Sequence, residues 1–246
     1  MIKIIQLHCN KFIGLAVVSF CLLSCTEKAG QKKSVLVFSK TTGGYRHASI
    51  EAGKKMFMQT GVERGYQVDT TENSGIFTAE GLKKYQGIVF LNTRGDILDS
   101  LQQLAFQQFI RSGGGFTGIH AATTTEYDWP WYNKLIGAYF DGHPEPQQAV
   151  YQVKDKTFPA VKHLPASFSW YDEVYNFRSV SDSLNVILTV QEDSYSGGKM
   201  GSVHPVSWYH EFEGGRSFYV GLGHFDEAYT DSSFIRLVWV GIEWTL

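Results

Sequence analysis

The chain has 246 residues, of which 43% are hydrophobic, 15% aromatic and 19% charged. This length and apolar content suit one α/β domain with a substantial core, and they exclude a wholly disordered chain. The net charge of −2 argues against binding through a basic surface, so we expect no nucleic-acid partner.

The first 24 residues resemble a lipoprotein signal peptide. After a start that carries two lysines, the apolar run 12–23 is too short to span a bilayer comfortably. It ends at Leu22-Leu23-Ser24-Cys25, the pattern of a bacterial lipobox, whose cysteine thiol is acylated. We expect lipid on Cys25 to anchor the protein in the cell envelope, with 25–33 as a polar tether and 34–246 as the folded domain. The alternative is an ordinary signal peptide that happens to contain a cysteine.

The cysteines also limit the chemistry. They are Cys9, Cys21 and Cys25, so the predicted domain contains no thiol. A cysteine nucleophile, a disulfide and a cysteine-ligated metal are therefore excluded there.

Apolar runs alternate with amphipathic segments in the first half. Strands are predicted at 34–39, 66–70, 87–91 and 116–120. Helices are predicted at 48–63, after Thr78, and at 101–110 behind an Asp99 or Ser100 cap. This alternation predicts a parallel sheet, in which ligands usually bind at the carboxyl edge. We therefore expect the site to be formed by the strand-end loops 40–47, 92–98 and 120–130.

The second half is rich in short β patterns. Strands are predicted at 149–153, 186–190, 203–212 and 217–220, and a last helix starts at Asp231. No linker separates the halves, so we expect one domain in which a mixed sheet extends the parallel one. The pattern does not predict the path of residues 155–184.

His120 is the leading candidate for catalysis. It ends the strand 116–120 between Gly118 and the small pair Ala121-Ala122, which predicts a sharp elbow that exposes the side chain. An imidazole there suits a general base or a metal ligand rather than an acyl-transfer nucleophile. The alternative is a histidine packed under a loop and hydrogen-bonded to the backbone.

Other histidines lie in polar, glycine-rich contexts, where glycine and proline shape the backbone near an exposed site but are also ordinary turn residues. The candidates for substrate binding among them are His47, His143, His204 and His224. The sequence has no HExxH motif and no His-x-His pair, although scattered histidines can converge as metal ligands at one edge of a sheet. We expect no cofactor, with a divalent metal as the alternative that the histidines leave open.

Two stretches, 126–132 and 172–178, combine carboxylates with aromatic rings, as sugar-binding sites do. Glu126 and Glu173 are the candidate acids, by analogy with the paired carboxylates of glycosidases. The remaining candidates for substrate contacts are Arg46, Asn92, Tyr127, Asp128, Trp129 and Tyr175. The alternative for the first stretch is a helix start, with Asp128 as its cap, Pro130 in its first turn and the tryptophans packed inward.

Taken in order, several stretches are similar to the trehalose-utilisation (ThuA-like) family over about 35–244. They are 45–50, 90–93, 113–122, 125–132, 137–144, 172–177, 200–205, 214–219 and 221–224. The resemblance implies a flavodoxin-like, class I glutamine-amidotransferase-like fold: a three-layer sandwich with a mostly parallel central sheet and a β-rich C-terminal extension. Relatives of that fold keep a cysteine at the elbow, where this chain has His120. Cysteine-dependent glutamine hydrolysis is thus not expected.

The resemblance also implies a link to disaccharide or keto-sugar metabolism. We expect an enzyme that cleaves a disaccharide or a 3-keto-glycoside by hydrolysis or elimination, with His120 as the base. Two alternatives stay open: a sugar-binding lipoprotein without chemistry, and a degenerate amidotransferase-like scaffold that binds a protein partner. The sugar, the linkage and the oligomeric state are not predicted.

Overall fold

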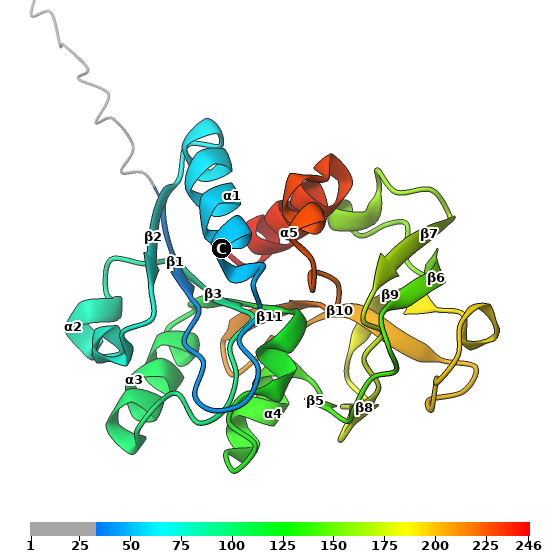
Figure 1. Cartoon of the computed structure of the whole chain (residues 1–246). Coiled ribbons are helices and arrows are strands. Elements are labelled where there is room, and N and C mark those ends of the chain that lie inside the picture. The colour runs from blue at the N-terminus through cyan, green and yellow to red at the C-terminus, as the bar shows by residue number, and fades with distance from the viewer. Residues whose placement is uncertain (1–32) are drawn as a thin grey trace, which may run out of the picture. The chain divides into compact units, whose positions relative to one another are not determined.

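The structure is a computed structural model that describes residues 33–246 (Figure 1). The predicted signal peptide, the lipidation site Cys25 and all but the last residue of the predicted tether lie outside the described residues. Between residues 33 and 246, no helix has both the length and the apolar character needed to cross a membrane.

One mixed sheet runs through the domain in the order β2-β1-β3-β4-β11-β10-β9-β6-β7. Its strands are β1 Ser34–Phe38, β2 Gln67–Thr71, β3 Gly87–Leu91, β4 Gly115–Ile119, β6 Gln147–Val153, β7 Ser167–Asp172, β9 Asn185–Val190, β10 His204–Phe212 and β11 Gly215–Val220. The helices are α1 Ile50–Glu63, α2 Ala79–Leu82, α3 Ser100–Arg111, α4 Pro130–Ile136 and α5 Ser232–Thr245. A separate ladder pairs β5 Tyr139–Phe140 with β8 Phe177–Arg178.

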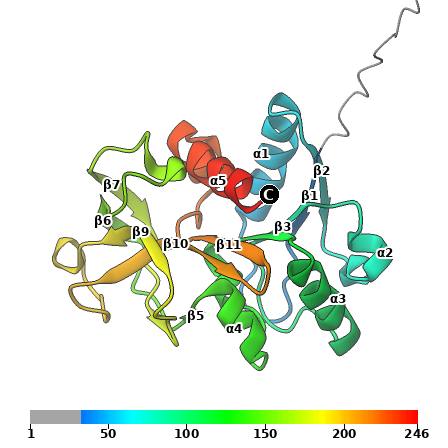
Figure 2. The same ribbon diagram turned by 180° about the vertical axis from the view of Figure 1, so that it is seen from behind.

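The sheet has two parts of different character, which we call the parallel half and the extension. In the parallel half, β2, β1, β3, β4 and β11 all pair in parallel. In the extension, β10, β9, β6 and β7 pair antiparallel to their neighbours, starting from β11. The predicted α/β class, with a mostly parallel centre and a β-rich extension, is confirmed (Figure 2).

Helices cover both faces of the parallel half: α1 and α5 lie on one side, and α2, α3 and α4 on the other (Figure 1). Alternate residues of β1 point to opposite faces of the sheet, so each face needs a covering layer of helices. Val35 and Val37 pack in the core that contains Trp239 of α5, whereas Leu36 packs in the core that contains Phe106 of α3. A strand buried on both faces reads as a continuous apolar run, which is why these strands could be predicted.

Local sequence sets where the helices begin. Asp99 accepts hydrogen bonds from the backbone of the first turn of α3, and Asp231 does the same for α5. The helix α4 starts at Pro130, as one alternative predicted, but Trp129 rather than Asp128 occupies its cap position.

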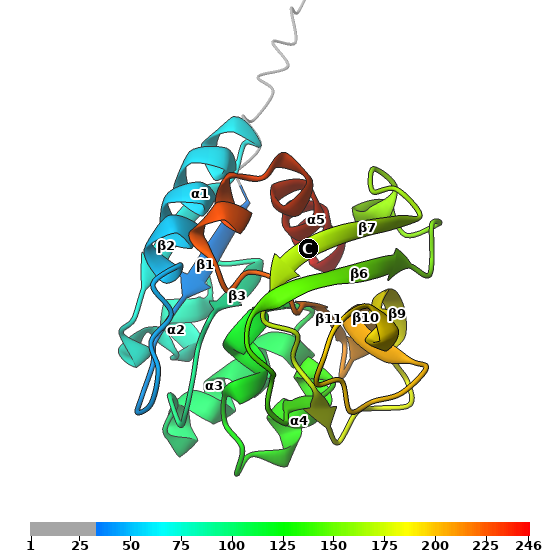
Figure 3. The same ribbon diagram turned by 45° about the vertical axis from the view of Figure 1, so that its right-hand side comes forward.

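The unpredicted region 155–184 contains the edge strand β7. Three strands separate β7 from β11 in the sheet order, yet Asp172 at the end of β7 accepts hydrogen bonds from the backbone N–H groups of Gly223 (2.8 Å) and His224 (3.1 Å). Figure 3 shows β6 and β7 curving across the molecule toward the loop that follows β11. The extension therefore returns to the carboxyl edge of the parallel half.

Candidate functional site

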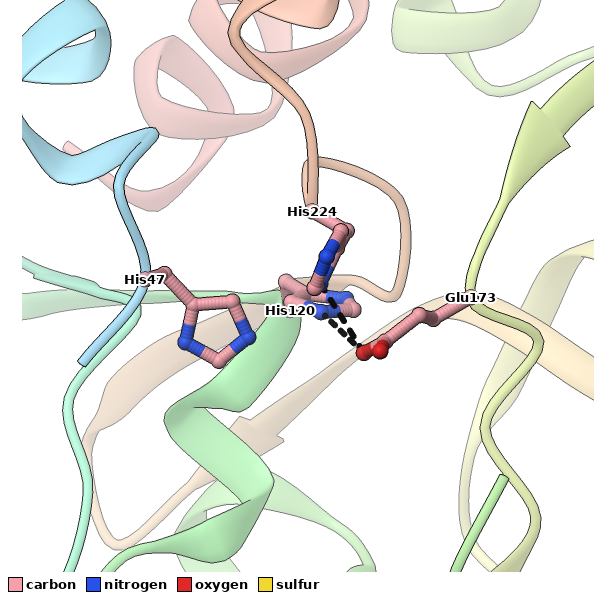
Figure 4. A group of neighbouring side chains, drawn as sticks. All are labelled: His47, His120, Glu173 and His224. Carbon is pink, nitrogen blue, oxygen red and sulfur yellow. Dashed lines mark ion pairs between the residues drawn. The ribbon is translucent and has the colours of Figure 1, made fainter. Parts of the chain in front are cut away.

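Three histidines and one glutamate meet at this edge (Figure 4). His47 lies in the loop after β1, His120 begins the short 3-10 helix η2 (His120–Thr124) after β4, and His224 lies in the loop after β11. Glu173 directly follows β7. One donor atom from each residue lies within 4.8 Å of the others. We call this group the His/Glu cluster.

The backbone at His120 forms the predicted elbow. Its φ angle is +46°, in the left-handed region that residues with side chains seldom adopt, and it joins β4 to η2. Such strain is typical of functional sites and costs about 1–3 kcal/mol. The turn aims the ring into the cluster rather than into solvent.

The ring of His120 is completely buried. Its Nδ1 lies 2.8 Å from the carbonyl oxygen of Gly221, so we assign the proton to Nδ1 and the free lone pair to Nε2. Tyr175 covers the ring at a centroid distance of 4.2 Å, and the exposed fraction of His120 is 0%. A substrate cannot touch a ring enclosed in this way, so the arrangement does not fit the expected direct role of His120 as the base.

The other two imidazoles complete one side of the cluster. The ring centroid of His47 lies 5.0 Å from those of both His120 and His224. Burial, reinforced by the charges of the other two rings, lowers the pKa of His47 to about 2. The His47 ring is therefore neutral near pH 7 and keeps a lone pair for a ligand.

Glu173 supplies the negative charge of the cluster. Its Oε2 lies 2.9 Å from Nδ1 of His224 and 3.4 Å from Nε2 of His120. Burial opposes ionisation of Glu173, but interactions with these two histidines outweigh it and hold the pKa of the carboxyl below its usual value. Glu173 is therefore an ionised carboxylate at neutral pH.

Asp172 orders the backbone behind the cluster. One oxygen accepts the N–H groups of Glu173 (2.9 Å) and His224, and the other accepts those of Gly223 and the Trp170 indole (3.2 Å). Sequence analysis noted this residue only as part of a polar stretch and assigned it no role. The available signal was a second acid directly before Glu173 at a strand end.

The cluster opens to solvent beside His143 and Tyr45. The His143 side chain is 34% exposed, and its Nε2 lies 3.6 Å from Oε1 of Glu173. Tyr45 is 55% exposed and stacks on the ring of His224 at an interplanar angle of 9°. Tyr45 was not among the residues predicted from the sequence, because one tyrosine in a glycine-rich loop carries no distinctive signal.

Glu126 lies outside the cluster. Its carboxylate accepts the backbone N–H groups of Ile97 and Leu98, both at 2.8 Å, and the side-chain amide of Gln103. Burial raises its pKa, and its exposed fraction is 2%. Glu126 therefore stabilises the loop after β3, and the structure does not support it as the catalytic acid.

Asn92 and His204 are also buried supports. The Asn92 side chain donates to Ser49 (3.1 Å) and Tyr229 (3.2 Å), tying strand-end loops together. His204 lies 2.7 Å from the carbonyl oxygen of Tyr175, the residue that covers His120. Neither Asn92 nor His204 has an exposed surface for a substrate.

The remaining predicted residues do not join the cluster. The Arg46 guanidinium forms exposed ion pairs with Glu51 and Glu72, both at 2.7 Å. Trp129 stacks on Trp131 and packs against the core, as the helix-start alternative predicted. Tyr127 donates to the carbonyl oxygen of Phe140, and Asp128 is exposed.

A hollow lined by the described residues lies away from the cluster. It measures about 480 Å³ and sits at the amino ends of β3 and β4, against Leu246. Its lining includes Lys83 but no histidine and no acidic side chain. We therefore locate the chemistry at the His/Glu cluster, whose nitrogen and carboxylate donors can hold a divalent metal, and at the exposed imidazole of His143 beside it, which can carry a proton.

Comparisons with known proteins agree with the fold. A family model described as "ThuA: Trehalose utilisation" matches residues 34–245. No curated protein matches the chain. Among solved structures, a putative ThuA-like protein from Bacteroides uniformis has a TM-score of 0.74 at 24% identity, covering 87% of this chain and 91% of its own. A similar protein from Parabacteroides merdae has a TM-score of 0.73 at 19% identity, with 87% and 90% covered.

Proposed function

Because this chain belongs to the ThuA, or trehalose utilisation, family, we propose that it cleaves a disaccharide or a 3-keto-glycoside at the His/Glu cluster. One observation carries the proposal: His47, His120, His224 and Glu173, far apart in sequence, converge at the carboxyl edge of the parallel strands. That edge is where open α/β sheets bind ligands. Clustered titratable groups with perturbed pKa values are typical of active sites.

His143 is the group that we assign to proton transfer. It is the more exposed partner of Glu173, and the carboxylate beside it stabilises the imidazolium that forms when the ring accepts a proton. Nδ1 of His143 lies 2.8 Å from the carbonyl oxygen of Pro144, and this contact orients the ring. His143 therefore takes the role that the sequence had assigned to His120.

The reaction class follows from the substrate. In a 3-keto-glycoside, the ketone acidifies the neighbouring C–H bond, and His143 removes that proton. The electron pair forms a carbon–carbon double bond while the glycosidic C–O bond breaks, and the proton passes to the leaving oxygen. With a plain disaccharide, the same base would activate water for hydrolysis.

The second candidate function is sugar binding without chemistry. The exposed ring of Tyr45 favours it, since an aromatic face above a polar cluster can stack on the apolar face of a sugar. The two candidates differ in whether the imidazoles react or only contact the ligand. Turnover therefore separates them, whereas binding alone does not.

The test uses the full chain purified in mild detergent. Trehalose and other disaccharides, each with its 3-keto counterpart, are incubated with the wild type, with His143→Gln and with His163→Gln as the matched control. His163 lies away from the cluster and contacts the carbonyl oxygen of Ser233. We expect cleavage by the wild type and the control, and a turnover about 10²–10⁴-fold lower for His143→Gln.

Two results would change the assignment. Equal turnover by His143→Gln would remove His143 from the mechanism. Binding of a sugar by a wild type that turns over none of the substrates would replace the enzyme with the sugar-binding alternative.

We also propose that Cys25 anchors the protein in the cell envelope. The lipobox pattern at residues 22–25 supports this proposal. Cys25→Ser expressed in the native host should lose incorporation of labelled fatty acid and leave the membrane fraction. Equal labelling of Cys25→Ser and wild type would exclude this anchor.

A further inference from the structure

We propose that His47, His120, His224 and Glu173 bind one divalent transition-metal ion. The inference deepens the proposed function by naming a metal for the same site, and it rests on that function only for the catalytic use of the ion. Metal binding itself is tested without any substrate.

Unpartnered donors inside the cluster are the first observation. Nε2 of His120 and Nδ1 of His224 are buried and have no hydrogen-bond partner, although both face the Glu173 carboxylate (Figure 4). His224 Nδ1 is close enough to Glu173 for a hydrogen bond but not aligned for one. A buried polar atom without a partner destabilises a fold by about 1–3 kcal/mol. A cation between these atoms would satisfy them together.

The distances suit an ion. Ligand atoms about 2.0–2.2 Å from a tetrahedral zinc ion lie about 3.3–3.6 Å from one another. The carboxylate oxygen of Glu173 already lies 2.9 Å and 3.4 Å from the nearest nitrogens of His224 and His120. All four donor atoms lie within 4.8 Å of each other, so side-chain shifts of about 1 Å would bring them to coordination distance.

Charge supplies an independent argument. Asp172 and Glu173 are adjacent and buried, and no ion pair of the described residues joins either of them to lysine or arginine. Hydrogen bonds from backbone N–H groups partly stabilise Asp172, whereas Glu173 faces only imidazoles. Buried charges are normally paired or coordinated to metal. A divalent cation would balance both carboxylates.

The surroundings already orient the donors as metal sites require. A metal-ligating histidine usually donates its other N–H to a carbonyl or carboxylate, which fixes the ring. His120 does so through Nδ1 to the Gly221 carbonyl oxygen. Asp172 holds the backbone on both sides of the cluster, at Glu173 and at His224. Groups outside the donor set thus hold the His120 ring and the backbone of Glu173 and His224 in place.

The donors also indicate the class of ion. Three imidazole nitrogens and one carboxylate oxygen suit Zn²⁺, Co²⁺, Fe²⁺ or Mn²⁺ better than Ca²⁺ or Mg²⁺, which prefer oxygen ligands. His143 is not part of the set but lies beside Glu173 on the open side. Substrate or water reaching the ion from that side would meet His143 as the proton carrier.

The experiment measures metal directly. The full chain, purified in mild detergent and stripped with a chelator, is titrated with ZnCl₂ and with CoCl₂. We expect one equivalent bound per chain after gel filtration, and visible absorption of Co²⁺ with the intensity of a four- or five-coordinate ion. Glu173→Gln and His224→Gln should weaken the affinity by more than the roughly 10–100-fold that changes around metal ligands cause.

Two controls make the result specific. His143→Gln and His163→Gln should bind one equivalent as the wild type does, and thermal unfolding checks that every variant is folded. A wild type without stoichiometric binding would overturn the inference, and so would folded Glu173→Gln and His224→Gln variants with unchanged affinity.

The outcome is separable from the proposed function. Binding of one metal equivalent per chain without cleavage of any saccharide would support this inference and exclude the proposed function. Cleavage that resists the chelator in a protein without stoichiometric metal would do the reverse.

Discussion

The two parts of the sheet contribute different groups to one site. The parallel half supplies His47, His120 and His224, each from a loop that follows a strand. The extension supplies Glu173 with its carboxylate and Asp172 behind it. The imidazoles therefore come from one part and the charge that organises them from the other.

Because the two parts supply different groups, the extension must curve back to the carboxyl edge of the parallel half. The carboxyl edge of a parallel sheet gathers its own loops without further help. Three strands separate the edge strand β7 from β11, and the end of β7 reaches the cluster only because the sheet curves and Asp172 binds the backbone at Gly223 and His224. The site depends on contact between the two parts as much as on either part.

Removing the charge that the extension supplies should have the largest effect. Glu173→Gln keeps the shape and loses the carboxylate, so we expect turnover of the cleaved saccharide to fall about 10²–10⁴-fold. Steady-state kinetics beside Glu63→Gln, an exposed acid on α1, would measure it. Unchanged kcat in Glu173→Gln would show that the parallel half works alone.

Cutting the contact between the parts should cost stability. Asp172→Ala leaves the backbone N–H groups of Glu173, Gly223 and His224 without their acceptor, and we expect the free energy of unfolding to fall by about 3 kcal/mol. Urea unfolding would measure this loss. Asp128→Ala, at an exposed site, should change it by less than about 0.5 kcal/mol. Similar changes in the free energy of unfolding for both variants would show that the Asp172 contact does not stabilise the fold.

A smaller effect, on KM, should distinguish an exposed tyrosine of the parallel half from one of the extension. Tyr45 and Tyr171 are similarly exposed, at 55% and 53%, but only Tyr45 stacks on a cluster histidine. Tyr45→Ala should raise KM about 3- to 10-fold at unchanged kcat, the equivalent of an aromatic contact. Tyr171→Ala should leave KM unchanged, and equal shifts in both would contradict a sugar platform at Tyr45.

The smallest effect should be a pH dependence inside the extension. Burial lowers the pKa of His210 in β10 below the usual histidine value of 6.5, against the opposing effect of its contact with the Leu135 carbonyl oxygen. At pH values between the lowered pKa of folded His210 and its usual pKa in the unfolded chain, the unfolded chain binds a proton at His210 that the folded chain does not. His210 therefore makes the free energy of unfolding fall as pH falls through this range. Urea unfolding between about pH 8 and pH 5 should show a shallower decline for His210→Gln. An identical decline in both proteins would exclude the effect.

The alternation of strands and helices was predictable where packing is simplest. β3 and β4 are buried on both faces and appear as short apolar runs, and the Asp99 cap marks the start of α3. β7 carries the alternating pattern of a half-buried strand, since Phe168 and Trp170 follow serines, but it is only six residues long and its first five residues are exposed or half-buried, so the signal was missed.

The site was predicted less completely than the fold. Glu173 and the three histidines were all among the candidates: the histidines for their places in polar, glycine-rich loops, and Glu173 for its stretch of carboxylates and aromatic rings. Their roles could not be assigned, since exposure depends on neighbours: Tyr175 encloses His120, whereas His143 stays open. Glu126 shows the same limit, because its carboxylate turns away to hold the backbone of 97–98.

Sequence by itself determined the α/β class with its parallel centre, the absence of a thiol from the predicted domain and the residue types available for chemistry. These follow from local patterns of hydrophobicity, capping and composition. Only the tertiary structure decided which polar groups meet, because Glu173 joins the histidines through a curved sheet and long-range hydrogen bonds that no local pattern encodes. Their surroundings then set their charge states: burial keeps the His47 ring neutral, whereas the neighbouring histidines keep Glu173 ionised against the effect of burial.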